Sequence, residues 1–214
     1  MSPRHYRPDK RRAAAAETRR RIVEATAGLH AEQGVVATTY AMIAERADVA
    51  IPTVYNHFPT RADLLGACTG EAALRAPPLG PGIYDGTGDA EARLRALVPA
   101  LFTYYRYYAP WMRWGVHEAP VVPELAAALR QTIVQPRPLI ELALAPAFAG
   151  TPPSTLVALC EILLNFSAWQ RLEGEAALGP AAREAVLGDA LIALVRAHGE
   201  ANPEPKGSTD DHQS

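Results

Sequence analysis

The feature that most constrains the fold is a helix-forming pattern that runs through nearly the whole chain. Alanine and leucine dominate, and the strand-like alternation of valine, isoleucine and threonine is nearly absent. Prolines and glycines interrupt the pattern at intervals, as they do between helices. The hydrophobic fraction of 49% and the charged fraction of 21% are those of a globular chain. We therefore predict an all-α protein.

Start and stop signals divide the chain into helical segments. Residues 76–88 are predicted to be a loop, and breaks are expected at Pro110 and near Gln135. The predicted helices are Ala13 to Gln33, a short one capped by Thr38 or Thr39 and ending at Ala47, Ile51 to Phe58, one capped by Thr60, Asp89 to Tyr108, one opening near Pro120 and Pro123, Ser154 to Leu172, and Pro180 to His198.

The net charge of −2 hides an asymmetry between the two ends of the chain. Residues 1–61 carry ten Lys/Arg against six Asp/Glu, and residues 62–214 carry eleven against seventeen. A basic head on an acidic body suggests an anionic partner, either nucleic acid or a membrane surface. The alternative is a solvated basic arm that specifies no partner.

Other signals concern the compartment. No apolar run approaches the ~20 residues that a membrane span requires, so we expect no membrane partner. The basic N-terminus lacks the apolar stretch of a secretory signal. Cys68 and Cys160 are far apart and fit a reducing environment, so we expect a cytoplasmic protein.

Two short predicted helices near the N-terminus are separated only by residues 48–50. This is the spacing of a helix-turn-helix, in which the second helix of the pair enters the major groove of DNA. The second helix has an apolar side that includes Val54 and Phe58. Its other side offers Ile51, Pro52, Thr53, Asn56 and His57.

The residues of this segment strengthen the interpretation. The run Thr-Val-Tyr-Asn-His-Phe at 53–58, followed by Arg61 and by leucines at 64 and 65, resembles the N-terminal domain of the tetracycline-repressor (TetR) family of bacterial transcription regulators. The resemblance covers about residues 17–66. It implies a helix-turn-helix domain followed by a helical body that binds an effector and forms a dimer.

The resemblance also implies roles at the DNA surface. Tyr55 resembles the family's phosphate-contacting tyrosine, and Thr38, Thr39 and Arg61 match positions near flanking phosphates. The residue types themselves suggest that Asn56 pairs with adenine and that Ile51 or Pro52 packs on a thymine methyl. Tyr55 and His57 as surface packing, and Thr53 as a hydroxyl bonded to its own helix, remain alternatives.

Seven of the fifteen aromatic residues fall within residues 102–114. Rings with polar tips suit an apolar pocket that orients a ligand through a few hydrogen bonds, although ordinary core packing is equally open. The charged groups Arg106, Arg113, His117 and Glu118 could select an ion or remain solvated. The predicted ligand-binding residues are Phe102, Tyr104, Tyr105, Tyr108, Trp111, Trp114 and His117.

The last two predicted helices are apolar on nearly every side and must be buried. A homodimer through these two helices would bury them, with Leu163 and Leu191 in or beside the interface; a monomeric core is the alternative.

Enzyme signatures are missing. The pair His117-Glu118 lacks the second histidine of a zinc HExxH motif, and there is no GxSxG, P-loop or GxGxxG pattern. We expect no catalytic residue, no metal and no cofactor.

The sequence therefore predicts a dimeric repressor that a small apolar or aromatic effector releases from a palindromic DNA operator. A DNA-binding regulator without an effector, or an all-helical cytoplasmic enzyme, are the alternatives. The expected parts are a basic flexible arm (1–16), a helix-turn-helix domain (17–62), a ligand-binding and dimerisation domain (63–199) and a disordered tail (200–214).

Overall fold

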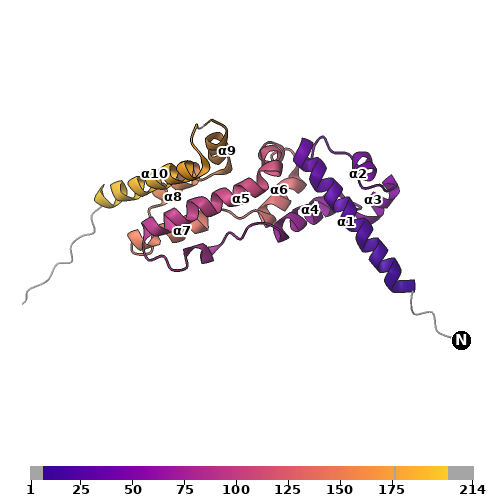
Figure 1. Cartoon of the computed structure of the whole chain (residues 1–214), viewed down its shortest axis with the longest axis horizontal. Helices are drawn as coiled ribbons and strands as arrows, with labels where there is room; N and C mark the ends of the chain where they lie inside the picture. The colour runs from indigo at the N-terminus through magenta and orange to yellow at the C-terminus, as the bar shows by residue number, and fades with distance from the viewer. Residues whose placement is uncertain (1–6, 176, 202–214) are drawn as a thin grey trace, which may run out of the picture. The chain divides into compact units, whose positions relative to one another are not determined.

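A computed structural model describes residues 7–175 and 177–201 of the chain, and within these ranges every regular element is a helix (Figure 1). The all-α prediction is confirmed. The elements are α1 (Arg7–Gln33), α2 (Tyr40–Arg46), α3 (Ile51–His57), α4 (Arg61–Leu74), the 3-10 turn η1 (Pro81–Tyr84), α5 (Ala90–Glu118), α6 (Pro123–Thr132), α7 (Arg137–Leu144), η2 (Ala145–Ala147), α8 (Ser154–Leu163), α9 (Phe166–Glu175) and α10 (Pro180–Ala201).

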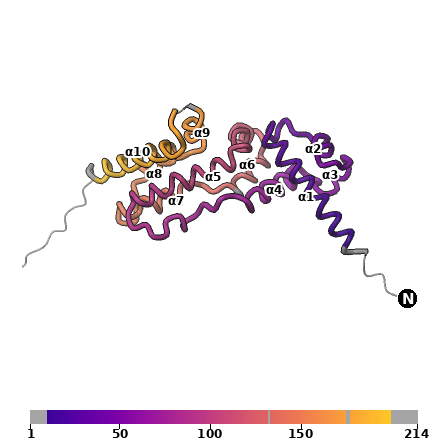
Figure 2. Tube along the Cα trace, in the orientation of Figure 1, coloured from indigo at the N-terminus to yellow at the C-terminus, as the bar shows by residue number. Residues whose placement is uncertain are grey.

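The described chain forms two compact units (Figure 2). Unit 1 comprises the chain up to Pro78 together with Arg106–Val134, and unit 2 comprises Leu79–Tyr105 together with the chain from Gln135 onward. Helix α5 contributes residues to both. This division differs from the predicted boundary at residue 62, which stays a prediction. Residues 1–6 of the predicted arm and 202–214 of the predicted tail lie outside the described residues.

The core of unit 1 joins the first helices to α6. Ile22 and Val54 are completely buried, and Phe58 is 1% exposed. The hydroxyl of Thr26, also fully buried, donates to the Ile22 carbonyl at 2.7 Å, so this polar group adds no unsatisfied donor to the core. Helix α4 packs against both α1 and α6.

Unit 2 has its own core around the first half of α5. Leu94 and Leu97 of α5 are fully buried, as are Ile140 of α7, Leu156 of α8 and Leu191 of α10. An aromatic cluster packs within the same unit. Its rings belong to Tyr105, Phe166 and Trp169, whose centroids are 5.3–5.9 Å apart.

Three predicted helix limits were wrong. Helix α1 begins at Arg7, six residues before the expected Ala13. Helix α5 continues through Pro110 to Glu118 and does not end at Tyr108. An interior proline costs a helix about 3 kcal/mol, but residues 111–118 pack or form hydrogen bonds within unit 1, and these interactions offset the cost.

The third error concerns the expected helix from Ser154 to Leu172, which breaks after Leu163. Asn165 causes the break. Its side-chain carbonyl accepts from the Ala168 N–H at 2.8 Å, as an N-cap does, and its amide donates to the Ile162 carbonyl at 2.8 Å. Among the described helices, none is both long and apolar enough to cross a bilayer.

Candidate nucleic-acid interface and internal cavity

The turn between α2 and α3 fixes the angle of the helix pair. Asp48 adopts a φ of 51°, a left-handed conformation that aspartate tolerates better than most residues. The Thr39 hydroxyl caps α2 by accepting from the Met42 N–H at 3.3 Å. Helix α3 starts without a side-chain cap, since Ala50 has none to offer, but Pro52 in its first turn needs no N–H partner.

Helix α3 divides into a buried side and an exposed side. Val54 faces the core of unit 1, while Ile51, Pro52, Tyr55 and Asn56 are exposed. Thr53 and His57 are half-buried at the edges. The exposed side thus presents an amide, two apolar groups and a phenol on one short helix.

Tyr55 is held by a second aromatic ring. Its ring stacks on that of Tyr40 of α2, with centroids 4.4 Å apart and planes within 11°. The Tyr40 hydroxyl donates to the Phe58 carbonyl at 3.3 Å. This stack limits the conformations open to Tyr55 while half of its surface remains exposed.

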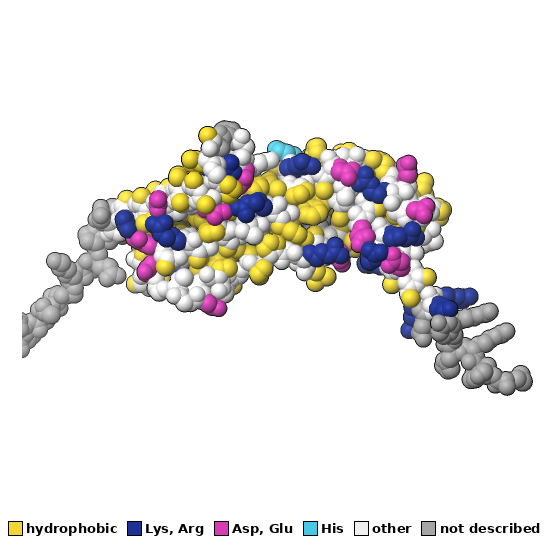
Figure 3. All heavy atoms as spheres, in the orientation of Figure 1, with side chains coloured by type: hydrophobic (Ala, Val, Ile, Leu, Met, Phe, Trp, Pro, Cys, Tyr) yellow, Lys and Arg dark blue, Asp and Glu magenta, His cyan; other side chains and the backbone are white. Residues whose placement is uncertain are grey.

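A groove of about 450 Å³ lies beside the exposed side of α3. Five of the sequence-predicted residues line it, namely Thr38 and Thr39 before α2, Ile51 and Tyr55 of α3, and Arg61 of α4. The Thr38 hydroxyl already donates to the Gly34 carbonyl at 2.6 Å, which leaves only its lone pairs for other donors. Exposed Lys and Arg side chains along the N-terminal part of α1 add positive charge to the same unit (Figure 3).

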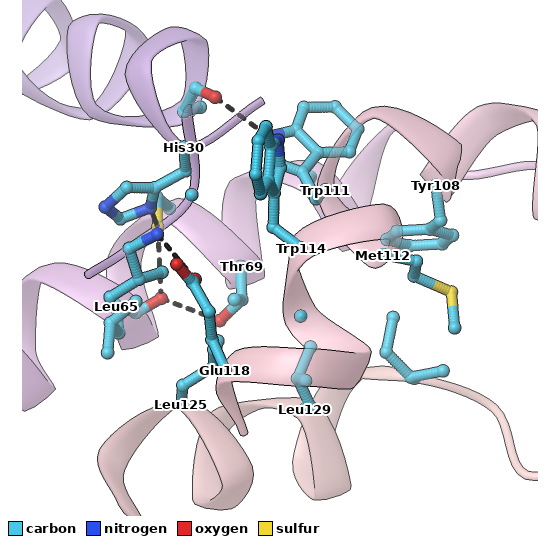
Figure 4. Close-up of a pocket in the computed structure, with 17 residues that line it drawn as sticks. His30, Leu65, Thr69, Tyr108, Trp111, Met112, Trp114, Glu118, Leu125 and Leu129 are labelled. Carbon is cyan, nitrogen blue, oxygen red and sulfur yellow. Dashed lines mark hydrogen bonds between the residues drawn. The ribbon is translucent and has the colours of Figure 1, made fainter. Parts of the chain in front are cut away.

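An internal cavity of about 50 Å³ lies within unit 1 (Figure 4). Its walls come from α1, the segment after α1, α4, the last part of α5 and α6. The lining is almost wholly apolar. It includes the indoles of Trp111 and Trp114, Tyr108, Met112 and Leu129.

Side chains of α5 complete the C-terminal end of α1. The last carbonyls of a helix have no partner within it and must find one elsewhere. The Ala31 carbonyl accepts from Arg113 Nη2 at 2.6 Å and from Trp114 Nε1 at 3.2 Å. One turn earlier, Trp111 Nε1 donates to the Ala27 carbonyl at 2.8 Å. The Arg113 charge also favours the negative end of the α1 dipole.

Glu118, the last residue of α5, binds the segment that follows α1. Its carboxylate accepts from the Val35 N–H at 2.7 Å and from the Val36 N–H at 3.1 Å. Gly34 has a φ of +83° and lies directly against this carboxylate. The loop that leads into α2 is therefore anchored to α5 through a charge-assisted pair of hydrogen bonds.

His30 of α1 lines both the cavity and the groove. Burial, helped by the positive charge of Arg61, lowers the pKa of His30 to about 4, so the ring is neutral at neutral pH. Its Nδ1 lies 3.8 Å from the Cys68 sulfur. Burial raises the pKa of the Cys68 thiol to about 12, which leaves the thiol protonated and unreactive.

The predicted ligand-binding residues separate into two groups. Tyr108, Trp111 and Trp114 line the cavity of unit 1. Phe102, Tyr104 and Tyr105 are buried in unit 2, and His117 is exposed on α5.

Sequence reasoning missed the contribution of α1 and α4 to the cavity walls, made through residues such as His30 and Leu65. It had weighed Glu118 only as one of several nearby charges. Among the described residues, no cluster of three or more His, Cys, Asp or Glu side chains could hold a metal.

Comparison with known proteins identifies the N-terminal segment. Residues 22–68 match the model of the "Bacterial regulatory proteins, tetR family". This segment is similar to the N-terminal domain of that family. The matched residues run from Ile22 of α1 to Cys68 of α4 and include the whole α2–α3 pair. The resemblance predicted from residues 53–65 is thereby confirmed. The match of this segment favours a regulatory rather than an enzymatic role.

Curated proteins that this chain resembles match a segment of similar length. The transcriptional repressor KstR of Mycolicibacterium smegmatis is 41% identical over 54 residues, which are 25% of this chain and 26% of that protein. The chain thus matches about a quarter of the length of the curated relatives it resembles.

Solved structures agree over a longer stretch. A tetR-family regulator from Streptomyces coelicolor has a TM-score of 0.60 at 19% identity, covering 87% of this chain and 83% of that one. The multidrug binding protein EbrR, complexed with imidazole, has a TM-score of 0.56 at 19% identity, covering 90% and 98%. These structures establish the fold.

Proposed function

We propose that this protein is a dimeric transcriptional repressor that inserts α3 into the major groove of a palindromic operator. The observation that carries the proposal is the exposed side of α3, described above, in a helix pair that matches the tetR family. Asn56 offers the bidentate amide that reads adenine, and Ile51 and Pro52 offer apolar contact for a thymine methyl. Thr53 and His57 flank this reading surface.

Phosphate contacts would come from the groove beside α3. Thr39, Tyr55 and Arg61 present hydroxyl and guanidinium donors there, whereas the Thr38 hydroxyl would have to exchange its bond to the Gly34 carbonyl for a phosphate oxygen. Such contacts hold the protein in register on the duplex without reading sequence. The Tyr40–Tyr55 stack supports this role, because a ring with few conformations loses little entropy on binding.

The test is a selection from random DNA with the full chain, followed by binding measurements on three variants. Asn56→Ala should lower the preference for one base in each half-site by about 1–3 kcal/mol. Tyr55→Phe should weaken all sequences alike. Gln170→Ala, an exposed amide on α9, is the matched control and should change neither property. Enrichment of no motif at all would refute the proposal.

A homodimer through α8 and α10 is the second part of the proposal. These helices pack together in unit 2 and carry exposed apolar side chains, with Leu159 at 42%, Ile162 at 61% and Val186 at 58% exposure. A second copy would cover them. Leu191 is fully buried in its own chain, so the exposed side chains are better probes than that residue.

Sedimentation of Ile162→Asp tests the dimer. In a two-fold interface each substitution occurs twice, and a buried carboxylate without a partner is costly. The variant should be monomeric at concentrations where the parent is a dimer. Val121→Asp is the control, since Val121 is 73% exposed and lies on unit 1. A monomeric parent would contradict this part of the proposal.

The third part is release of the operator by a small molecule bound in the unit 1 cavity. Tyr108, Trp111 and Trp114 supply aromatic walls, and the same wall residues hold the end of α1. A molecule that enters must disturb these contacts, which belong to the unit that carries α3. Operator affinity measured with and without bound compounds tests this; an unchanged affinity at saturation would refute it.

A further inference from the structure

The chemistry of the cavity wall restricts what the cavity can bind. Among its lining residues, Glu118 is the one with an ionised side chain, because His30 is neutral at neutral pH. The remaining wall is apolar, with two indoles and a phenol. Indole and phenol faces attract cations, and an apolar wall excludes the water that would otherwise screen the charge.

The Glu118 carboxylate has capacity to spare. Its two oxygens each accept one backbone N–H, from Val35 and Val36. A carboxylate offers about four acceptor positions, so roughly two remain. Within residues 7–175 and 177–201, no ion pair joins Glu118 to a cationic side chain, although its indole neighbour Trp114 has the Arg113 guanidinium 5.6 Å from its ring centroid. The wall of the cavity therefore includes a half-buried carboxylate that accepts two backbone N–H groups.

We propose that the effector of this protein is a lipophilic organic cation, such as an aryl ammonium ion, whose charge lies on Glu118 and whose apolar part lies against Trp111 and Trp114. The inference rests on the proposed function, because it names the effector of that same regulator.

The volume of the cavity gives the direction of the response. About 50 Å³ leaves room for a few water molecules, because one water needs about 10–15 Å³ of cavity volume on this measure. An aryl ammonium ion needs more room than this, so the walls must part to admit it, and we infer that α5 moves away from the end of α1. That movement breaks the bonds from Trp111 to Ala27 and from Trp114 to Ala31.

The consequence reaches the helix pair through the loop that precedes α2. The same movement of α5 carries the Glu118 carboxylate away from Val35 and Val36, which frees the segment that ends at the α2 cap, Thr39. The α2–α3 pair then loses an anchor. The protein therefore cannot hold the cation in the cavity and the operator on the α2–α3 pair equally well at the same time, so the cation releases the DNA.

The test compares two probes of one shape. Phenyltrimethylammonium carries a quaternary nitrogen, and tert-butylbenzene has carbon in its place. Binding to the full chain is followed by tryptophan fluorescence. The cation should bind at least about tenfold more tightly than the neutral probe. Glu118→Gln should reduce this preference to what the aromatic faces alone provide and leave tert-butylbenzene binding unchanged, whereas Glu124→Gln, an exposed glutamate of α6, should keep the full preference.

Equal affinity of the two probes for the parent protein would overturn the inference without any variant, so the test survives if Glu118→Gln fails to fold. An undiminished cation preference in a folded Glu118→Gln would also overturn it. Saturating cation should weaken binding to the selected operator by about tenfold or more, and an unchanged operator affinity would overturn the release step. A protein that selects an operator but ignores the cation refutes only this inference; one that binds the cation but selects no operator refutes the proposed function.

Discussion

Replacing Gly34 by alanine should destabilise the protein far more than its backbone conformation alone predicts. Gly34 has a φ of +83°, a region in which a Cβ costs about 1–2 kcal/mol. The new Cβ would also stand 2.8 Å from Glu118 Cδ and 2.9 Å from Oε2, so the carboxylate must move. It would then lose its bonds to the Val35 and Val36 N–H groups.

The size of the second effect follows from those two bonds. A hydrogen bond to a charged group contributes about 1.5–3 kcal/mol, and the exposed bond to Val36 belongs at the lower end. The two together give about 3 kcal/mol. Gly34→Ala should therefore lower the free energy of unfolding by about 4–5 kcal/mol, the sum of the conformational and the displacement effects.

Gly86→Ala provides the matched control, because Gly86 has a φ of +79° and no atom within 4 Å of the added Cβ. It should cost only about 1–2 kcal/mol. Urea unfolding of both variants, and of Gly34→Ala combined with Glu118→Ala, measures the difference. In the Glu118→Ala background, Gly34→Ala should cost no more than the control. Equal costs of Gly34→Ala and Gly86→Ala in the parent would refute the anchoring role of Glu118.

Three further results are expected. Asp48→Gly should raise the free energy of unfolding by about 0.5–1 kcal/mol in urea titrations, because glycine adopts the φ of 51° without strain, whereas Asp48→Ala should lower it. The pKa of His30 is lower in the folded than in the unfolded chain, so the stability that the neutral ring contributes is complete above pH 6.5 and is lost as the pH falls toward 4, by about 3 kcal/mol. The free energy of unfolding of His30→Leu should therefore depend less on pH over this range, and parallel curves for the variant and the parent would contradict this. The logarithm of the operator-binding constant should fall with the logarithm of the salt concentration, with a slope of about −0.9 for each phosphate contacted, and Arg61→Ala should reduce the size of that slope by about one. Filter binding at several salt concentrations measures the slope, and a slope near zero would mean that no phosphates are contacted.

Local signals made the N-terminal helices predictable. The cap at Thr60, the proline at 52 and the short interval at 48–50 are all read within a few residues, and the structure has α2, α3 and α4 there. The break at Asn165 was equally local but was overlooked, because an apolar pattern on both sides masked a residue that caps one helix as it ends another.

The cavity was less predictable, because its walls come from distant segments. Trp111 and Trp114 were identified by their clustering, yet their N–H partners are main-chain carbonyls more than 80 residues away, and a carbonyl has no sequence signature. Nothing in the spacing distinguished these rings from Tyr104 and Tyr105, which belong to the other unit. Pro110 misled for the same reason, since packing by distant residues outweighed its local cost.

The completion of α1 by side chains of α5 limits how far the DNA-reading part can act as an independent module. A fragment that ends at residue 78 retains α1 to α4 but loses Arg113, Trp114 and Glu118, and with them the partners of the Ala31 carbonyl and of two loop amides. Grafting this head onto another regulator would therefore require residues 106–118 to travel with it. The acceptors on α1 are main-chain carbonyls, so the graft does not require alanine itself at positions 27 and 31. It requires only side chains small enough for the indoles to approach.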